Sequence, residues 1–276
     1  MTLSERNIFF KAGIAFSALC IIICIVSSIR VIPVYGFMED DIARRSEGIL
    51  QAFAGLYTNV KLMAVHCCIL ALVLFSFLSV IFIHYFFEKT HSPEILFIVF
   101  FAASFATEAF RLVIPLGYVY EIPSLYLILS SRMVLAGRFF GLFSIFTASV
   151  FAVGFEAQQR NVILIITVVT LVMALGVPID TQDWDSSLNM VNSYNSMFRL
   201  IEIGIFLITT ISFFIAAWRR GSREFAFIGA GSALVFTGRN ILLNADAWAG
   251  LPVGLLLLAA GTWLICTKLH KVYLWL

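Results

Sequence analysis

Eight apolar segments, each long enough to cross a lipid bilayer, follow one another along this chain of 276 residues. A transmembrane helix needs about 20 mainly apolar residues. Within a bilayer every backbone polar group must be hydrogen-bonded internally, so such segments form helices. The segments span residues 12–30, 62–86, 95–117, 123–155, 161–179, 196–217, 225–244 and 249–268. The sequence therefore predicts an all-α fold, a polytopic transmembrane helical bundle, with residues 1–276 forming a single membrane domain.

Two of the segments leave the number of spans open. Residues 123–155 form a long run, either one tilted helix or a short re-entrant piece before Gly137 followed by a helix. Residues 161–179 form a short run that ends near Pro178. If either segment does not cross, the bundle has seven spans instead of eight.

The composition agrees with the membrane class and excludes several others. The chain is 61% hydrophobic and 12% charged, whereas a soluble domain has about 25% charged residues. A net charge of only +2 gives no case for nucleic acid binding. No polar stretch is long enough for a soluble catalytic or signalling domain. The first apolar run continues to Ile29, beyond the 7–15 residues of a signal-peptide core, and is expected to stay as an uncleaved helix.

The orientation follows from the lysines and arginines that flank the spans, because cytoplasmic connections are enriched in both. One set of flanks holds Arg6, Lys11, Lys89, Arg160, Arg219, Arg220, Arg223, Lys268 and Lys271. The opposite set holds Arg30, Arg44, Arg45 and Lys61, all at the first loop, and its other loops contain neither residue. We therefore expect both termini in the cytoplasm and a multi-pass protein in the cytoplasmic (inner) membrane of a bacterium.

Charged side chains inside the spans are the strongest indication of function. They are Glu108, Arg111, Arg132, Arg138, Arg199, Glu202 and Arg239. An arginine near the bilayer centre costs roughly 2.5–3.5 kcal/mol on insertion scales, so such residues normally face a bundle interior or a wet cavity. In the predicted orientation most of them lie at similar depth, toward the outer side. The sequence thus predicts that four helices contribute charge to one outward-facing cavity.

The same charges also allow a purely structural interpretation. Glu108 and Arg111 are three residues apart, as are Arg199 and Glu202, so each pair shares a helix face and could neutralise itself. Arg132 and Arg199 could extend to the headgroups. Even then the arginines outnumber the acids within the spans, although Asp246 could reach one of them.

An anion-binding pocket is the interpretation that accounts for the surplus of positive charge. Arg111, Arg138 and Arg239 would contact the anion, because a guanidinium group presents a fork of donors to a carboxylate or phosphate. Glu108 and Glu202 would orient the arginines or carry a coupled proton. The complete set of expected ligand-binding residues is Glu108, Arg111, Arg132, Arg138, Arg199, Glu202, Arg239 and Asn240.

No other chemistry is indicated by the sequence. His66 and His84 lie on one helix face, but no partner histidine for a haem lies in another span. The five cysteines fall within the spans and predict no disulfide framework. No nucleophile motif, intramembrane aspartate pair or Ser/His pair at common depth is evident. We therefore expect no catalytic residue, cofactor or metal; the absence of a catalytic motif argues against an enzyme without excluding one, since Glu108 or Glu202 could act as a base.

Residues 36–58 form the one extended polar connection, and their pattern is amphipathic. Ile42, Ile49 and Phe53 fall near one helical face, with acidic residues at the start. We expect an external amphipathic segment that lies on the membrane surface or forms a lid over the bundle.

These observations predict a membrane protein that binds an anionic small molecule or lipid headgroup, for transport or for sensing through a partner. The expected partners are membrane lipids, the anionic ligand and a partner protein that supplies output or energy. Two alternatives stay open: an enzyme that modifies lipid headgroups, and a structural subunit of a membrane complex. A polar channel that continues to the cytoplasm would favour transport, and a closed interior below the pocket would favour sensing or catalysis.

Overall fold

The computed structural model describes residues 3–34, 62–87, 92–155, 158–185, 187–192, 195–245 and 248–274. Within these ranges eight helical segments are long and apolar enough to cross a membrane, which confirms the predicted polytopic bundle. The amphipathic segment expected at 36–58 lies outside the described residues.

The helices follow the predicted spans, with longer ends. The first span is α1 (Leu3–Val31), which continues into the short helix η1 (Ile32–Val34), and the second is α3 (Leu62–Phe87). The third span is built from α4 (Pro93–Ser104), the 3₁₀ helix η3 (Phe105–Leu112) and α5 (Val113–Tyr120). The remaining spans are α6 (Ser124–Val153), α7 (Gln159–Gly176), α8 (Asn195–Arg219), α9 (Arg223–Leu243) and α10 (Gly250–Leu274).

The structure bears on both segments that left the number of spans open. Helix α6 is continuous through Gly137, so residues 123–155 contain one long helix and no re-entrant piece. Helix α7 has only 18 residues but qualifies as a span. Helix α1 begins nine residues before the predicted boundary, because hydropathy marks the hydrocarbon core and a helix can extend beyond it.

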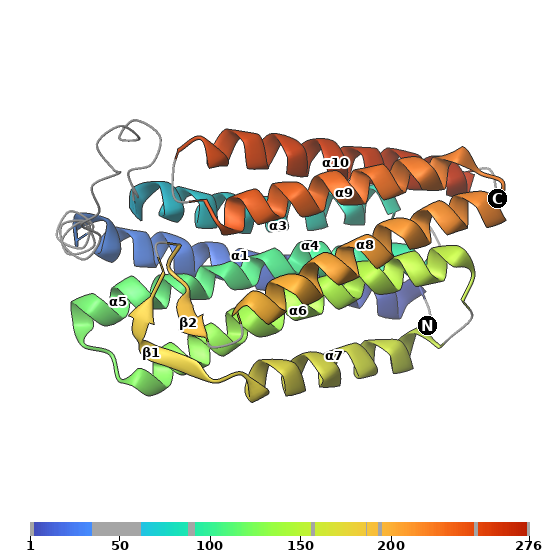
Figure 1. Cartoon of the computed structure of the whole chain (residues 1–276). Helices are drawn as coiled ribbons and strands as arrows, with labels where there is room; N and C mark the ends of the chain where they lie inside the picture. Colours follow the sequence, from blue (N-terminus) through green and yellow to red (C-terminus); the bar gives the residue numbers. More distant parts are fainter. Residues whose placement is uncertain are drawn as a thin grey trace, which may run out of the picture.

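The loop after α7 contains a feature that the sequence did not predict, a small antiparallel β-hairpin. Its strands are β1 (Ile179–Trp184) and β2 (Met190–Asn192). The hairpin lies at the end of the bundle opposite to the two chain termini (Figure 1). We call these the hairpin end and the terminal end; the eight spans place both termini at the same end.

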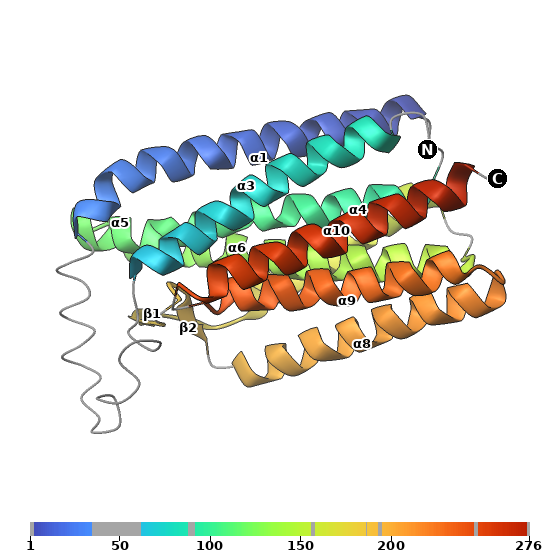
Figure 2. The same ribbon diagram turned by 90° about the horizontal axis from the view of Figure 1, so that it is seen from above.

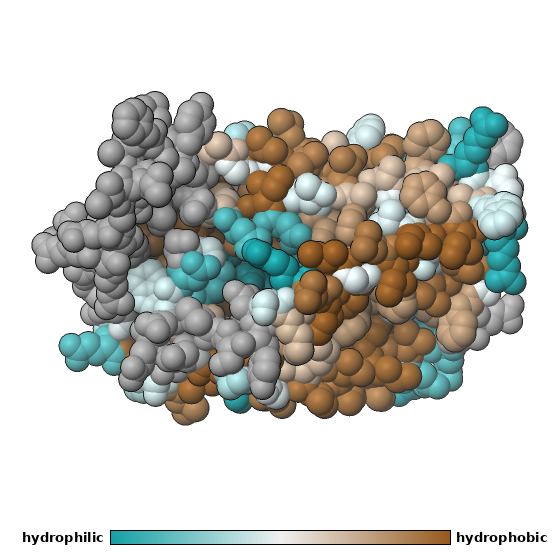
Figure 3. Space-filling model, in the orientation of Figure 1, coloured by the Kyte–Doolittle hydropathy of each residue, from teal (hydrophilic) through white to brown (hydrophobic). Residues whose placement is uncertain are grey.

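The flank of the bundle has the apolar surface of a membrane protein. Brown, hydrophobic residues cover much of the visible face between the two ends (Figure 3). Exposed leucines at positions 164, 200 and 256 are examples of this surface. A hydrophilic patch interrupts it, extending from the hairpin end toward the middle of the visible face.

The third span is the centre of the bundle. It is the most buried of the eight candidate spans, at 83% of its apolar window. Helices α1, α3 and α6 pack against it, and the view from above shows α4 between α1 and α6 (Figure 2). Phenylalanines of this span, among them Phe97, Phe101 and Phe105, belong to the largest apolar core. A polar side chain on this span is therefore surrounded by other helices.

Two glycines let α6 approach the third span very closely. A Cβ atom at Gly137 would lie 1.9 Å from Thr107 Oγ1, and one at Gly141 would lie 2.2 Å from Ser104 Oγ. Both hydroxyls turn back to their own helix: Ser104 donates to Phe101 O and Thr107 donates to Ser104 O, each at 2.7 Å. This small-residue packing is typical of membrane helices. It places the residue after Gly137, Arg138, against the central span.

The 3₁₀ segment η3 occurs where the third span carries its charges. Runs of 3₁₀ helix longer than three or four residues are uncommon, and those within a helix often mark functional or strained sites. Pro115 lies just beyond this segment, and because proline has no N–H group and its ring clashes with the carbonyl four residues earlier, it disturbs the helix as far back as Arg111, at the end of η3. Since residues i and i+3 eclipse in a 3₁₀ helix, Glu108 and Arg111 are stacked along one edge of η3.

Candidate functional site

Glu108 is the centre of the candidate site. Its carboxylate is 2% exposed and accepts hydrogen bonds from arginines on two different elements. Arg138 on α6 donates to it twice, from Nε at 2.7 Å and from Nη2 at 2.8 Å. Arg111, on the same 3₁₀ turn, donates from Nη1 at 3.2 Å. The two-point contact with Arg138 is the charge-assisted geometry that makes an Arg–carboxylate pair strong and directional.

The other acid within the predicted spans, Glu202, is partly buried and pairs with an arginine from a neighbouring helix. Glu202 on α8 accepts a hydrogen bond from Arg239 Nη1 on α9. It forms no ion pair with Arg199, three residues earlier on its own helix, so the self-neutralising interpretation of that spacing is wrong. In both cases the arginine that bonds across helices follows a closely packed glycine, Gly137 or Gly238.

The two ion pairs belong to one group. Arg239 interacts electrostatically with Glu108, and Glu202 with Arg138. Arg111 Nη2 also approaches Leu243 O on α9 at 3.5 Å, which links the third span to α9. We call the five side chains the charge cluster: Glu108, Arg111, Arg138, Glu202 and Arg239. Its three guanidinium groups and two carboxylates leave one positive charge among the described residues; Asp246 lies outside them.

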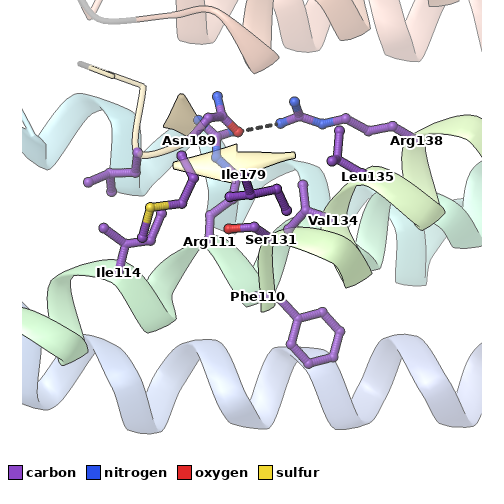
Figure 4. A pocket seen from close by; sticks show the side chains of 11 residues that line it. Phe110, Arg111, Ile114, Ser131, Val134, Leu135, Arg138, Ile179 and Asn189 are labelled. Carbon is purple, nitrogen blue, oxygen red and sulfur yellow. Dashed lines mark hydrogen bonds between the residues drawn. The ribbon is translucent and has the colours of Figure 1, made fainter. Parts of the chain in front are cut away.

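A cavity of about 30 Å³ lies beside the cluster, between η3, α6 and the hairpin. This volume holds roughly two water molecules. Arg111 and Arg138 line it together with Ser131 and with hairpin residues that include Asn189 (Figure 4). Glu108 is almost fully buried, whereas the Arg138 side chain is 22% exposed. Because Arg138 also lines the cavity, the Arg138 guanidinium can be reached from there.

The hairpin supplies an uncharged hydrogen-bond acceptor to Arg138. Asn189 Oδ1 accepts a hydrogen bond from Arg138 Nη2 at 2.9 Å, drawn as a dashed line in Figure 4. The Asn189 amide donates to Ser187 Oγ at 2.7 Å, and Ser187 is 3.3 Å from Asp185 Oδ2. A chain of polar contacts therefore runs from the tip of the hairpin to the cluster. Sequence reasoning missed Asn189 because the loop offered no periodic pattern to place it.

The structure does not bring the other expected site residues into this cavity. Arg199 is exposed on α8, as expected for a side chain that extends toward the headgroups. Arg132 is half-buried on α6, and its Nε finds no hydrogen-bond partner among the described residues. Asn240 is half-buried on α9, and Arg239 is buried against Glu202. None of these four lines the cavity; of the expected site residues, Arg111 and Arg138 line it.

The expectation that no Ser/His pair lies at common depth is wrong. Ser28 Oγ on α1 is 2.7 Å from His66 Nε2 on α3, near the hairpin end. The serine hydroxyl also donates to Cys24 O at 2.6 Å, one turn earlier, and His66 is fully buried. Neither side chain lines the cavity beside the cluster. The contact joins α1 to α3; serine and histidine are 38 residues apart, so sequence spacing could not reveal it.

A separate group of polar side chains surrounds a buried acid, Glu94, at the terminal end. Glu94 is 2% exposed and accepts hydrogen bonds from Ser92 Oγ at 2.5 Å and from Tyr273 OH at 2.7 Å. Arg220 Nη2 lies 3.9 Å from the same carboxylate. These contacts tie the start of α4 to α10 and to the turn after α8. The predicted span 95–117 leaves Glu94 outside, although an acid directly after Pro93 is typical of a helix start.

Other chemistry finds no support among the described residues. No group of three or more His, Cys, Asp or Glu side chains in the described ranges is arranged to hold a metal ion. All five cysteines are free thiols. Comparisons of the chain with protein-family models, with curated proteins and with solved structures find no match.

Proposed function

We propose that this integral membrane protein binds a small oxyanion at the charge cluster, in the cavity under the hairpin. The observation that carries the proposal is the surplus guanidinium charge beside a cavity from which Arg138 can be reached. A structural ion pair needs only equal numbers of acids and bases, whereas three arginines with two acids leave room for an anionic partner. In the orientation predicted from the flanking lysines and arginines, the site faces outward.

The interior between the cluster and the terminal end favours sensing over transport. Large apolar side chains pack there, including Phe97, Phe151 and Phe213 in the main core. An anion passing toward the terminal end would have to cross this largely apolar packing, at a high desolvation cost. We therefore propose a receptor whose occupied state is recognised by a partner protein.

The direct test is the thermal stability of purified protein in detergent or nanodiscs, with acetate, phosphate or sulfate added at ionic strength matched with chloride. An anion that binds the folded state stabilises it, by about 2.7 kcal/mol at a concentration 100 times the dissociation constant. We expect a rise in Tm for the wild type and a much smaller rise for Arg138→Gln.

Arg199→Gln is the matched control, because it removes the same charge from an exposed position at the same end of the bundle. It should respond to the anion like the wild type. Equal responses of the two variants would show a non-specific salt effect. If no anion stabilises the wild type, the cluster is a device for packing helices and the proposal is wrong.

A further inference from the structure

The tip of the hairpin is held in place by an unusual residue. Leu188 has a positive φ of 56°, in the left-handed region that favours glycine. Its side chain is nevertheless fully buried, in an apolar cluster with Val31 and Leu112. The turn is closed by two backbone bonds, from Leu188 N–H to Asp185 O at 2.9 Å and from Asp185 N–H to Asn189 O at 2.8 Å. A strained backbone that persists because its side chain is anchored is common at ligand clamps.

This anchored turn brings Asn189 to the cluster. Among the described residues, Arg138 receives acceptor atoms from two sources, the carboxylate of Glu108 and the amide oxygen of Asn189. The amide oxygen is neutral, so the hydrogen bond is weaker than the one an anionic oxygen would form at the same position. Asn189 therefore accepts a hydrogen bond from Arg138, the most accessible arginine of the cluster, but does not neutralise the surplus positive charge of the cluster.

We infer that Asn189 Oδ1 marks the position of a ligand carboxylate oxygen, and that the tip of the hairpin is the lid that this ligand displaces. The inference rests on the proposed function and names its ligand class. A single surplus positive charge matches a monoanion, and a planar carboxylate matches the fork of a guanidinium group. The hairpin residues Ile179, Leu188, Asn189 and Met190 form one wall of the cavity, so moving the tip opens it.

The sharpest test is Asn189→Asp, which places a carboxylate on the protein where the ligand carboxylate is expected. This variant should have a higher Tm than the wild type without ligand, because the new charge neutralises the cluster. Its apparent affinity for acetate should fall roughly tenfold or more, since the position is already taken by an anion. Asn189→Leu should have a lower Tm and keep its response to acetate, because Arg138 loses an acceptor and gains no competitor.

Asn161→Asp is the matched control, with the same change of charge at an exposed position near the terminal end. It should bind acetate like the wild type. In the wild type, acetate should also stabilise more than phosphate at equal concentration. Saturating acetate should speed hydrogen exchange at the Asp185 and Leu188 amides, whose bonds close the turn.

The outcomes separate this inference from the function on which it rests. If no anion stabilises the wild type, both are wrong. If acetate stabilises the wild type and Asn189→Asp equally, or leaves hydrogen exchange at the turn unchanged, the inference that the hairpin tip is a lid is wrong. The proposal that the cluster binds an anion would still stand. If Asn189→Asp does not fold, the response of Asn189→Leu and the exchange measurement still decide. A stronger response to phosphate than to acetate would overturn the ligand class.

Discussion

At the scale of single residues, burial is unequal within each ion pair of the charge cluster. Glu108 is almost fully buried between two arginines, so its loss leaves two guanidinium groups facing each other. Arg239 is 3% exposed and its partner Glu202 is 25% exposed, so Glu202 can be partly hydrated when Arg239 is removed but not the reverse. A buried charge left without its partner costs about 3–5 kcal/mol in soluble proteins.

These differences in burial predict the order in which four substitutions lower the Tm of the protein without ligand. Glu108→Gln should lower the Tm most, followed by Glu202→Gln, because each leaves a buried arginine unpaired. Arg239→Gln should cost less, and Arg138→Gln least, since Glu108 keeps Arg111. Melting curves in one detergent measure the four variants side by side. A larger loss for Arg138→Gln than for Glu108→Gln would contradict the surplus of positive charge on which the anion site depends.

The sequence could predict which charges matter but not all their partners. Hydropathy and chain direction give the depth of a residue, and depth correctly grouped Glu108, Arg138 and Arg239. Depth does not give the direction in which a side chain points around its helix. Depth therefore admits both Arg199 and Arg239 to the site, with extension to the headgroups left open for Arg199, and the structure exposes Arg199 and pairs Arg239 with Glu202. The Ser28–His66 contact joins residues 38 positions apart, which sequence spacing does not bring together.

At the scale of elements, the contact between α6 and η3 decides whether Arg138 reaches Glu108. In Gly137→Ala the new methyl group would lie 1.9 Å from Thr107 Oγ1 and 2.6 Å from Thr107 Cβ. The helices must separate, and overpacking of this kind costs about 1–3 kcal/mol. We expect a lower Tm and a weaker response to anions, because the bidentate Arg138–Glu108 contact is stretched.

Gly204→Ala is the matched control for this substitution. Gly204 lies within α8, and its added Cβ would meet no atom of another described element within 4 Å, so this change should be neutral or slightly stabilising through helix propensity. Adding Thr107→Ala to Gly137→Ala should restore part of the lost stability, because it removes the closest clashing atoms. If the losses of stability from Gly137→Ala and Thr107→Ala simply add, the contact between these two residues does not control the distance between α6 and η3.

Elements differ in how far a single sequence determines them. The eight helices follow from long apolar runs, which leave the backbone no alternative in a bilayer. The 3₁₀ segment ends close to Pro115, and the pattern of apolar residues does not distinguish it from an α-helix. The hairpin has few residues and depends on the burial of Leu188, a tertiary contact. The elements that shape the cavity are thus the ones that sequence patterns describe least.

At the scale of the whole molecule, polar and apolar interiors are segregated along the bundle axis. The charge cluster, its cavity and the hairpin lie toward the hairpin end, and large apolar side chains such as Phe97 and Phe213 pack toward the terminal end, where the Glu94 group is also buried. The flanking lysines and arginines are segregated too: Arg219, Arg220 and Lys271 belong to the terminal end. If the terminal end is cytoplasmic, the anion site samples the outside while the packed half separates it from the cytoplasm. Orientation is therefore the premise of the receptor proposal.

The orientation can be measured with reporter fusions at three positions. We expect fusions after Arg223 and at the C-terminus to report the cytoplasm, because the positive residues near them favour that side. A fusion after Ser186, within the acidic loop that contains the hairpin, should report the outside. Removing Arg219, Arg220 and Arg223 together should weaken the preference without changing the number of spans, since the eight apolar helices set that number. A C-terminal fusion that reports the outside would invert the molecule, make the hairpin cytoplasmic and turn the proposed site into a sensor of an internal anion.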